Sequence, residues 1–120
     1  MSESFKKLLV WQRAIQLTIQ IYGITATFPA SERFGLTNQL RRAAVSIASN
    51  IAEGYGRASR GEYIQFLGHA RGSSFEVETQ LAIARALGLS SRNSLERAEA
   101  DCIEVSRTLA GMLTGLRRKN

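Results

Sequence analysis

The sequence has little of what most enzymes and secreted domains depend on. Its 120 residues include one cysteine, one proline and one histidine. The lone Cys102 can form neither an internal disulfide nor a cysteine cluster for zinc, which fits a reducing cytoplasm. His69 alone has too few partners for a metal cage or a catalytic triad, and a solvated surface histidine is the expectation. We therefore predict no metal ion, no cofactor and no catalytic residue, and a protein that is not an enzyme.

Long apolar runs are also absent. No uninterrupted apolar stretch reaches the roughly 18 residues that suggest a membrane helix, and residues 1–13 lack the apolar run and cleavage site of a signal peptide. We therefore expect a cytoplasmic protein without a membrane segment. Hydrophobic residues make up 44% of the chain, which excludes a disordered chain, and the length suits one domain over residues 1–120.

Apolar residues recur with helical spacing in four segments, and no segment alternates as a strand would. We expect the first helix from Ser4 to Phe28, where Pro29 stops it. The second begins near Leu36 or Thr37, with Thr37 a plausible N-cap, and ends at Gly54. The third opens with a capping box at residues 59–62 and ends at Gly88, and the fourth runs from within 90–94 to about 118. Short connections predict an all-α, antiparallel up-down-up-down four-helix bundle.

The first three helices carry more apolar surface than one bundle needs. On the first helix, Leu8, Trp11, Ile15, Ile19, Tyr22 and Ala26 form one stripe, and a second apolar stripe lies on another side. Large apolar side chains left in water forgo roughly 1.5–3 kcal/mol each, and contiguous apolar patches mark interfaces. Glycines within the third helix would suit close approach of another helix. We therefore predict a homo-oligomer whose interface comprises Val10, Leu17, Ile21, Ile24, Phe28, Ala44, Ala48, Ala52, Ile64, Gly68, Gly72 and Phe75. The alternative is that loops or distorted packing cover these residues within one chain.

The chain is basic, with a formal net charge of +6 and a pI near 10.2. An antiparallel bundle brings one group of cations to a single end: Lys6, Lys7, Arg57, Arg60, Arg117, Arg118 and Lys119. The acids expected there are fewer, namely Glu3, Glu53 and Glu62. This clustering of cations predicts a surface that binds the phosphate backbone of RNA or DNA. The alternatives are solvated cations at helix ends and, for the basic charge as a whole, an anionic membrane surface.

Two features of the second helix allow more than one interpretation. Gln39, Arg42, Ser46, Asn50 and Glu53 form a polar stripe that either lines a groove or is the ordinary wet face of the helix. A flatter face of small residues is interrupted by Arg41, for which the sequence offers no explanation.

Residues 36–57, LTNQLRRAAVSIASNIAEGYGR, resemble the four-helix-bundle protein family encoded by intervening sequences within bacterial 23S ribosomal RNA genes. Further matches lie at residues 9–12, 28–29, 62–67 and 72–78, and the resemblance weakens in the fourth helix. It implies a bundle that assembles into a ring-like pentamer. Similar proteins serve as accessory factors to reverse transcriptases in diversity-generating retroelements, where a basic ring engages nucleic acid and the polymerase. The resemblance supplies no catalytic residues.

We therefore predict a non-enzymatic oligomeric adaptor that binds RNA or DNA through its basic end. Its expected partners are further copies of itself, nucleic acid, and a reverse transcriptase or another protein. The alternative is a protein-interaction scaffold with no direct role in nucleic-acid binding.

Overall fold

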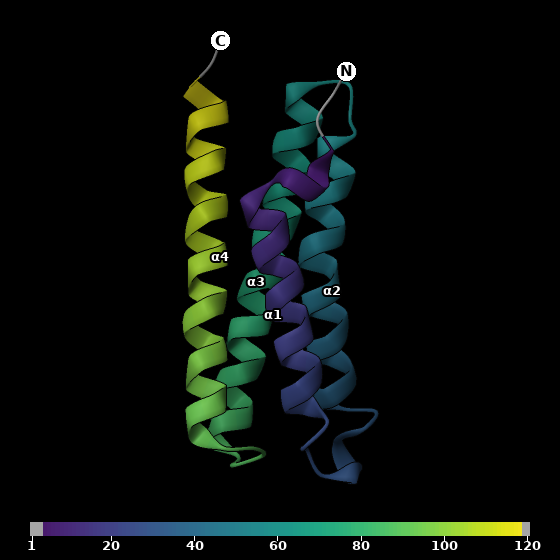
Figure 1. Ribbon diagram of the computed structural model, residues 1–120, viewed down its shortest axis with the longest axis vertical. Coiled ribbons are helices and arrows are strands. Elements are labelled where there is room, and N and C mark those ends of the chain that lie inside the picture. The colour runs from purple at the N-terminus through teal and green to yellow at the C-terminus, as the bar shows by residue number, and fades with distance from the viewer. Residues whose placement is uncertain (1–3, 119–120) are drawn as a thin grey trace.

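The computed structural model describes residues 4–118, and within this range the protein is helical with no strand (Figure 1). Four long helices pack against each other: α1 (Leu9–Thr25), α2 (Leu36–Tyr55), α3 (Arg60–Ala86) and α4 (Arg92–Arg118). Two short 3₁₀ helices accompany them, η1 (Phe5–Lys7) before α1 and η2 (Ala30–Glu32) between α1 and α2. The prediction of an all-α fold with four helices is confirmed. Among the helices of the described range, none combines the length and hydropathy needed to cross a bilayer.

The helices occupy the corners of a square. α1 packs against α2 and α4, α3 packs against the same two helices, and α1 and α3 lie diagonally across the core. Figure 1 shows both chain ends and the α2–α3 connection at one end of the molecule. The α1–α2 and α3–α4 connections lie together at the other end.

Local hydrogen bonds explain where the helices begin and end. Ser59 caps α3 as expected, since its Oγ accepts the N–H of Glu62 at 3.1 Å. Gly88 follows α3 with φ of 67°, a conformation that favours glycine. The first helix is shorter than predicted, because Ser4 caps η1 and Leu8 is extended before α1 starts.

The predicted N-cap of the second helix is wrong. Thr37 lies inside α2 and is buried, and the N-cap position is occupied by Gly35, whose side chain offers no acceptor. The carboxylate of Glu32 takes over this role from the preceding turn by accepting the N–H of Leu36 at 3.1 Å. This cap from four residues upstream satisfies a free donor of the first helical turn.

The structure contradicts most of the predicted oligomer interface. Seven of its residues are buried within the single chain: Val10, Leu17, Ile21, Ile24, Phe28, Ala44 and Ala48. On α1 the two apolar stripes exchange roles, because the stripe predicted to face a neighbour fills the core. The stripe predicted to fill the core is half-buried or exposed. Of the remaining predicted interface residues, Ala52, Ile64 and Gly68 are half-buried, and Gly72 and Phe75 are exposed. For these five the interface stays a prediction.

Small side chains on α2 bring its neighbours close. On the α1 side, Thr18 donates to the carbonyl of the buried Ala44 at 3.2 Å. On the α3 side, the closest approach is at Gly54, where an added Cβ would lie 2.7 Å from the Cβ of Phe66 and 3.1 Å from Cδ1 of Tyr63. Gly54 is therefore required by packing in the last turn of α2.

We expect Gly54→Ala to lower the free energy of unfolding by about 1–3 kcal/mol, because Phe66 has no room to move without shifting α3. Gly111→Ala on α4 is the matched control, since a Cβ there meets no atom within 4 Å. That substitution should raise stability by up to about 1 kcal/mol through helix propensity. Denaturant unfolding measures both changes. Equal effects of the two substitutions would contradict the close α2–α3 contact.

Candidate nucleic-acid interface

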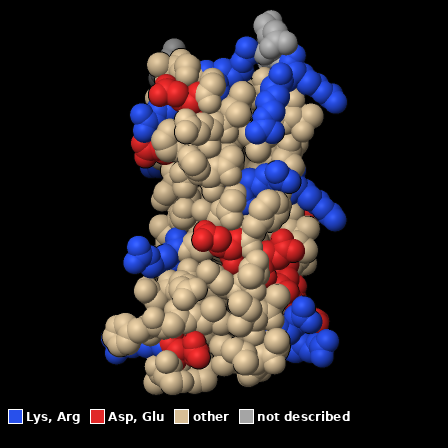
Figure 2. Space-filling view, turned by 180° about the vertical axis from the view of Figure 1, so that it is seen from behind, with Lys and Arg blue, Asp and Glu red and all other residues tan. Residues whose placement is uncertain are grey.

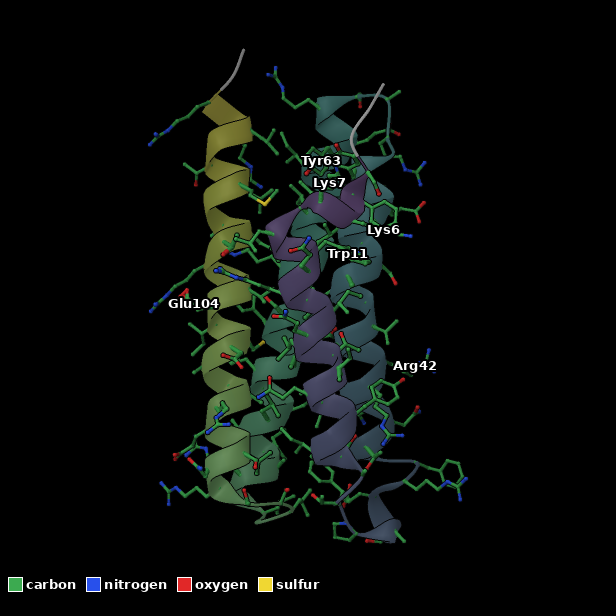
Figure 3. All side chains as sticks on the ribbon, in the orientation of Figure 1. Lys6, Lys7, Trp11, Arg42, Tyr63 and Glu104 are labelled. Atoms are coloured by element: carbon green, nitrogen blue, oxygen red, sulfur yellow. The ribbon has the colours of Figure 1, made fainter. Side chains whose placement is uncertain are left out.

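The end of the bundle that holds both chain termini collects cations from four separate segments. Lys6 and Lys7 come from η1, Arg57 from the α2–α3 connection, Arg60 from the start of α3, and Arg117 and Arg118 from the end of α4. All six residues are exposed. Figure 3 shows Lys6 and Lys7 toward this end, and Figure 2 shows blue side chains gathered at the upper right, where α4 ends. We call these six residues the basic end. Lys119, which was also predicted to belong here, lies outside the described residues.

Acidic side chains offset only part of this charge. Glu53 accepts a hydrogen bond from Arg57 at 2.6 Å, an exposed pair one helical turn apart. Glu62 takes part in the capping box of α3, with the hydroxyl of Ser59 3.4 Å from its Oε1. Arg57 also stacks on Phe66, with its guanidinium carbon 4.7 Å from the ring centroid. Its position is therefore fixed by an acid and an aromatic ring.

Aromatic rings pack against each other within the segments that carry these cations. Tyr55 and Tyr63 meet edge to face with their ring centroids 6.2 Å apart. Burial, and secondarily the neighbouring Tyr55, raises the pKa of Tyr63, so its phenol stays neutral. Phe5 packs edge to face on Trp11 at 5.4 Å and attaches η1 to the start of α1. The rings support the backbone that carries the cations.

The opposite end of the bundle has a smaller excess of positive charge. Its cations are Arg33, Arg41, Arg85, Arg92 and Arg97, and its acids are Glu32, Glu96 and Glu99. Four of these residues form ion pairs. Arg85 binds Glu99 at 2.9 Å and Arg92 binds Glu96 at 2.9 Å, while the Glu32 carboxylate caps α2. The excess of positive charge is thus larger at the end that holds the termini.

Comparison with known proteins identifies the family. A family model described as "23S rRNA-intervening sequence protein" matches residues 6–111. The chain belongs to this family. The match includes α1, α2 and α3 entirely and most of α4, and it confirms the resemblance seen in residues 36–57.

A solved structure is similar over most of the chain. It is that of a protein with unknown function from the S23 ribosomal protein family of Bacteroides thetaiotaomicron VPI-5482. The two chains superpose with a TM-score of 0.79 at 22% identity, over 88% of this chain and 98% of the other. This likeness shows the shared fold. No curated protein matches the chain.

Three of the five residues in the polar stripe of this family member's α2 line a groove against α3. Ser46 and Ser73 share a hydrogen bond of 2.8 Å across the two helices, and Asn50 donates to Ser46 from one turn further along. Gln39 and Arg42 line the same groove, of about 370 Å³. The stripe is therefore part of the helix packing as well as a wet face, an alternative that the sequence had left open.

Arg41 has a clear structural role that the sequence did not reveal. It lies 2.9 Å from Thr25 through Nε and 3.4 Å from the carbonyl of Tyr22, and its guanidinium stacks over the Tyr22 ring at 4.5 Å. A cation that binds the last carbonyls of a helix also opposes the helix dipole favourably. Arg41 on α2 therefore closes the C-terminal end of α1.

The two residues most often associated with reactivity sit in unreactive surroundings. His69 is exposed on α3 and packs edge to face against Phe66. Cys102 is buried in the core, where its thiol donates to the carbonyl of Ser74 at 3.1 Å. Burial, followed by the charge of Glu78, raises the pKa of Cys102 to about 12.

We expect Cys102 to resist a thiol-reactive dye at about pH 8 in the folded protein, because the thiol is both protonated and covered. Labelling should be complete in guanidinium, where the pKa returns to about 8.5. Because the pKa of Cys102 is higher in the folded than in the unfolded protein, the protonated thiol stabilises the fold fully at pH values below the unfolded pKa. This contribution is lost as the pH rises from there toward 12. Cys102→Ala gives the background rate. Rapid labelling of the native protein would contradict the buried position.

Proposed function

We propose that the protein is a non-enzymatic, cytoplasmic adaptor that binds the phosphate backbone of RNA or DNA through its basic end. The observation that carries the proposal is the gathering of six exposed cations from four segments at one end, whereas two of the arginines at the opposite end are paired with glutamates. Backbone binding depends on many Lys and Arg contacts and releases counterions from the nucleic acid. The exposed basic end suits such contacts, and no sequence-specific readout is needed.

Assembly strengthens this proposal. We propose that up-down-up-down bundles associate into a ring-like homo-oligomer, a pentamer by family resemblance. In a ring whose axis is parallel to the helices, every copy presents its basic end on the same side. A modest charge per chain then becomes a broad basic surface, which raises both affinity and association rate for a polyanion. The same resemblance supports a reverse transcriptase as a protein partner of the ring.

A protein-interaction scaffold without nucleic-acid binding is the second candidate. It is favoured by apolar side chains that remain exposed on the flanks of the bundle, away from the basic end. The two candidates differ in their response to salt, because only contacts to phosphates release condensed counterions.

Titration of the purified protein with a structured RNA at two salt concentrations tests the proposal. We expect an affinity that falls steeply with salt, with a log–log slope near −0.9 for each phosphate contacted. Arg60→Glu with Arg118→Glu should weaken binding at least tenfold and reduce the slope by about 2, because two contacts are lost.

The matched control is Arg33→Glu with Arg92→Glu, which changes the net charge equally at the opposite end. We expect this variant to keep most of the affinity and the full salt slope. Equal losses in the two variants would show a response to net charge alone and contradict a localised surface. Absence of salt-dependent binding in the unmodified protein would favour the scaffold.

A further inference from the structure

A groove at the C-terminal end of α2 shares Arg57 with the basic end. It has a volume of about 610 Å³ and is lined by Ser49, Ala52, Glu53, Gly56 and Arg57. The first four of these residues follow the i, i+3, i+4, i+7 spacing of one helix face. Ser49, Ala52 and Gly56 have small side chains or none, so the two large side chains in the lining are those of Glu53 and Arg57.

Two contacts hold the Arg57 side chain in place. Its Nη2 donates to Oε2 of Glu53 at 2.6 Å, and its guanidinium carbon lies 4.7 Å from the centroid of the Phe66 ring. Phe66 belongs to α3 and does not line the groove, so one face of the guanidinium is covered from the α3 side. The Arg57 side chain is still 39% exposed. The guanidinium is therefore an oriented planar group whose other face is open to a ligand.

The charges that line the groove favour an uncharged ligand over a phosphate. The Glu53 side chain is 54% exposed, and a carboxylate in the lining repels a phosphate. A nucleobase carries no net charge, its flat face stacks on a guanidinium plane, and the amino groups of cytosine and adenine can donate to a carboxylate. A base is thus the part of a nucleic acid that fits this groove. The other cations of the basic end offer contacts for the phosphates of the same strand.

We infer that the groove holds an unpaired nucleobase stacked on the open face of the Arg57 guanidinium, and that the basic end prefers single-stranded nucleic acid. The inference rests on the proposed function and names the class of nucleic acid that the basic end takes. A duplex keeps its bases stacked on each other, whereas a single strand can turn a base out. Every base has a flat face, so this contact selects a strand type without selecting a sequence. Glu53 and Phe66 are positioning residues, since they orient Arg57.

Electrostatic attraction alone predicts the opposite preference. A duplex carries one charge per about 1.7 Å of its axis, and each contact to it releases more counterions than a contact to a single strand. A surface that binds only phosphates therefore binds the duplex more tightly. Tighter binding of the single strand requires a contribution from its bases, which is the contribution that the groove supplies.

Three dye-labelled probes of equal length test the inference by fluorescence anisotropy: a single strand, its duplex, and an abasic strand that keeps the phosphates and lacks the bases. We expect the unmodified protein to bind the single strand more tightly than the duplex. It should also bind the single strand at least about fivefold more tightly than the abasic strand, the lower part of the range for one stacked base. RNA and DNA versions distinguish the two sources of unpaired bases, and this preference in either version supports the groove.

Two substitutions act on the groove without changing the net charge. Arg57→Lys keeps the positive charge and removes the planar guanidinium, and Ser49→Leu fills the groove from an exposed position. Each should lower the affinity for the single strand toward that for the abasic strand, while the salt slope is retained. Asn38→Leu is the matched control, because Asn38 is exposed about three turns earlier on α2 and does not line this groove. It should leave all three affinities unchanged.

The three probes separate this inference from the proposed function. An abasic strand that binds as tightly as the complete strand, with affinities that fall with salt, would overturn the base contact and leave the basic end as a phosphate-binding surface. Variants that weaken the binding of the two strands by the same factor would also overturn the base contact. Absence of salt-dependent binding to all three probes would contradict both the base contact and the proposed function.

Discussion

The close packing of α2 between α1 and α3 is the contact on which the rest of the structure depends. Ala44 lets α1 approach on one side, and Gly54 lets α3 approach on the other. These contacts fix the α2–α3 connection beside the chain termini, where Arg57 and Arg60 join Lys6 and Arg118 (Figure 1). Interior packing tolerates little change in volume, so the position of the basic end follows from small side chains that carry no charge themselves.

Much of this fold could be predicted from the sequence because its signals are local. Ser59 and Glu62 lie three residues apart and cap α3 as their spacing indicates. The group of cations at one end follows from four helices with short connections. By contrast, Arg41 of α2 caps the end of another helix, and Glu32 caps α2 from a turn that precedes it. Helical periodicity contains no information about either partner.

The choice between two apolar stripes was the main error of sequence reasoning, and its cause is physical. On α1, Leu17 and Ile21 have much the same hydrophobicity as Ile15 and Ile19, so periodicity identifies both stripes and ranks neither. The core selects Leu17 and Ile21 because α2 and α4 enclose that side of α1. Large apolar side chains do remain exposed, but on α1 they are Leu9, Ile19 and Tyr22 and not the stripe that was predicted.

The ends and the flanks of the bundle therefore differ in charge and polarity. One end is strongly basic, two ion pairs lie at the opposite end, and large apolar side chains are exposed along the flanks. In the oligomer that we propose, association through the flanks would leave the ends uncovered, so assembly and binding of a polyanion would not compete for the same residues. Each added copy would bring another basic end, and the attraction for a nucleic-acid backbone grows with the number of cations in reach.

Photo-crosslinking to a thiouridine-containing RNA, followed by mass spectrometry of the linked peptides, tests the central claim most directly. The account predicts crosslinks within residues 4–8, 55–63 and 112–118, which meet at the basic end. It also predicts that these crosslinks disappear as salt is raised. Crosslinks concentrated in residues 27–35 and 87–93, at the opposite end of the bundle, would contradict it.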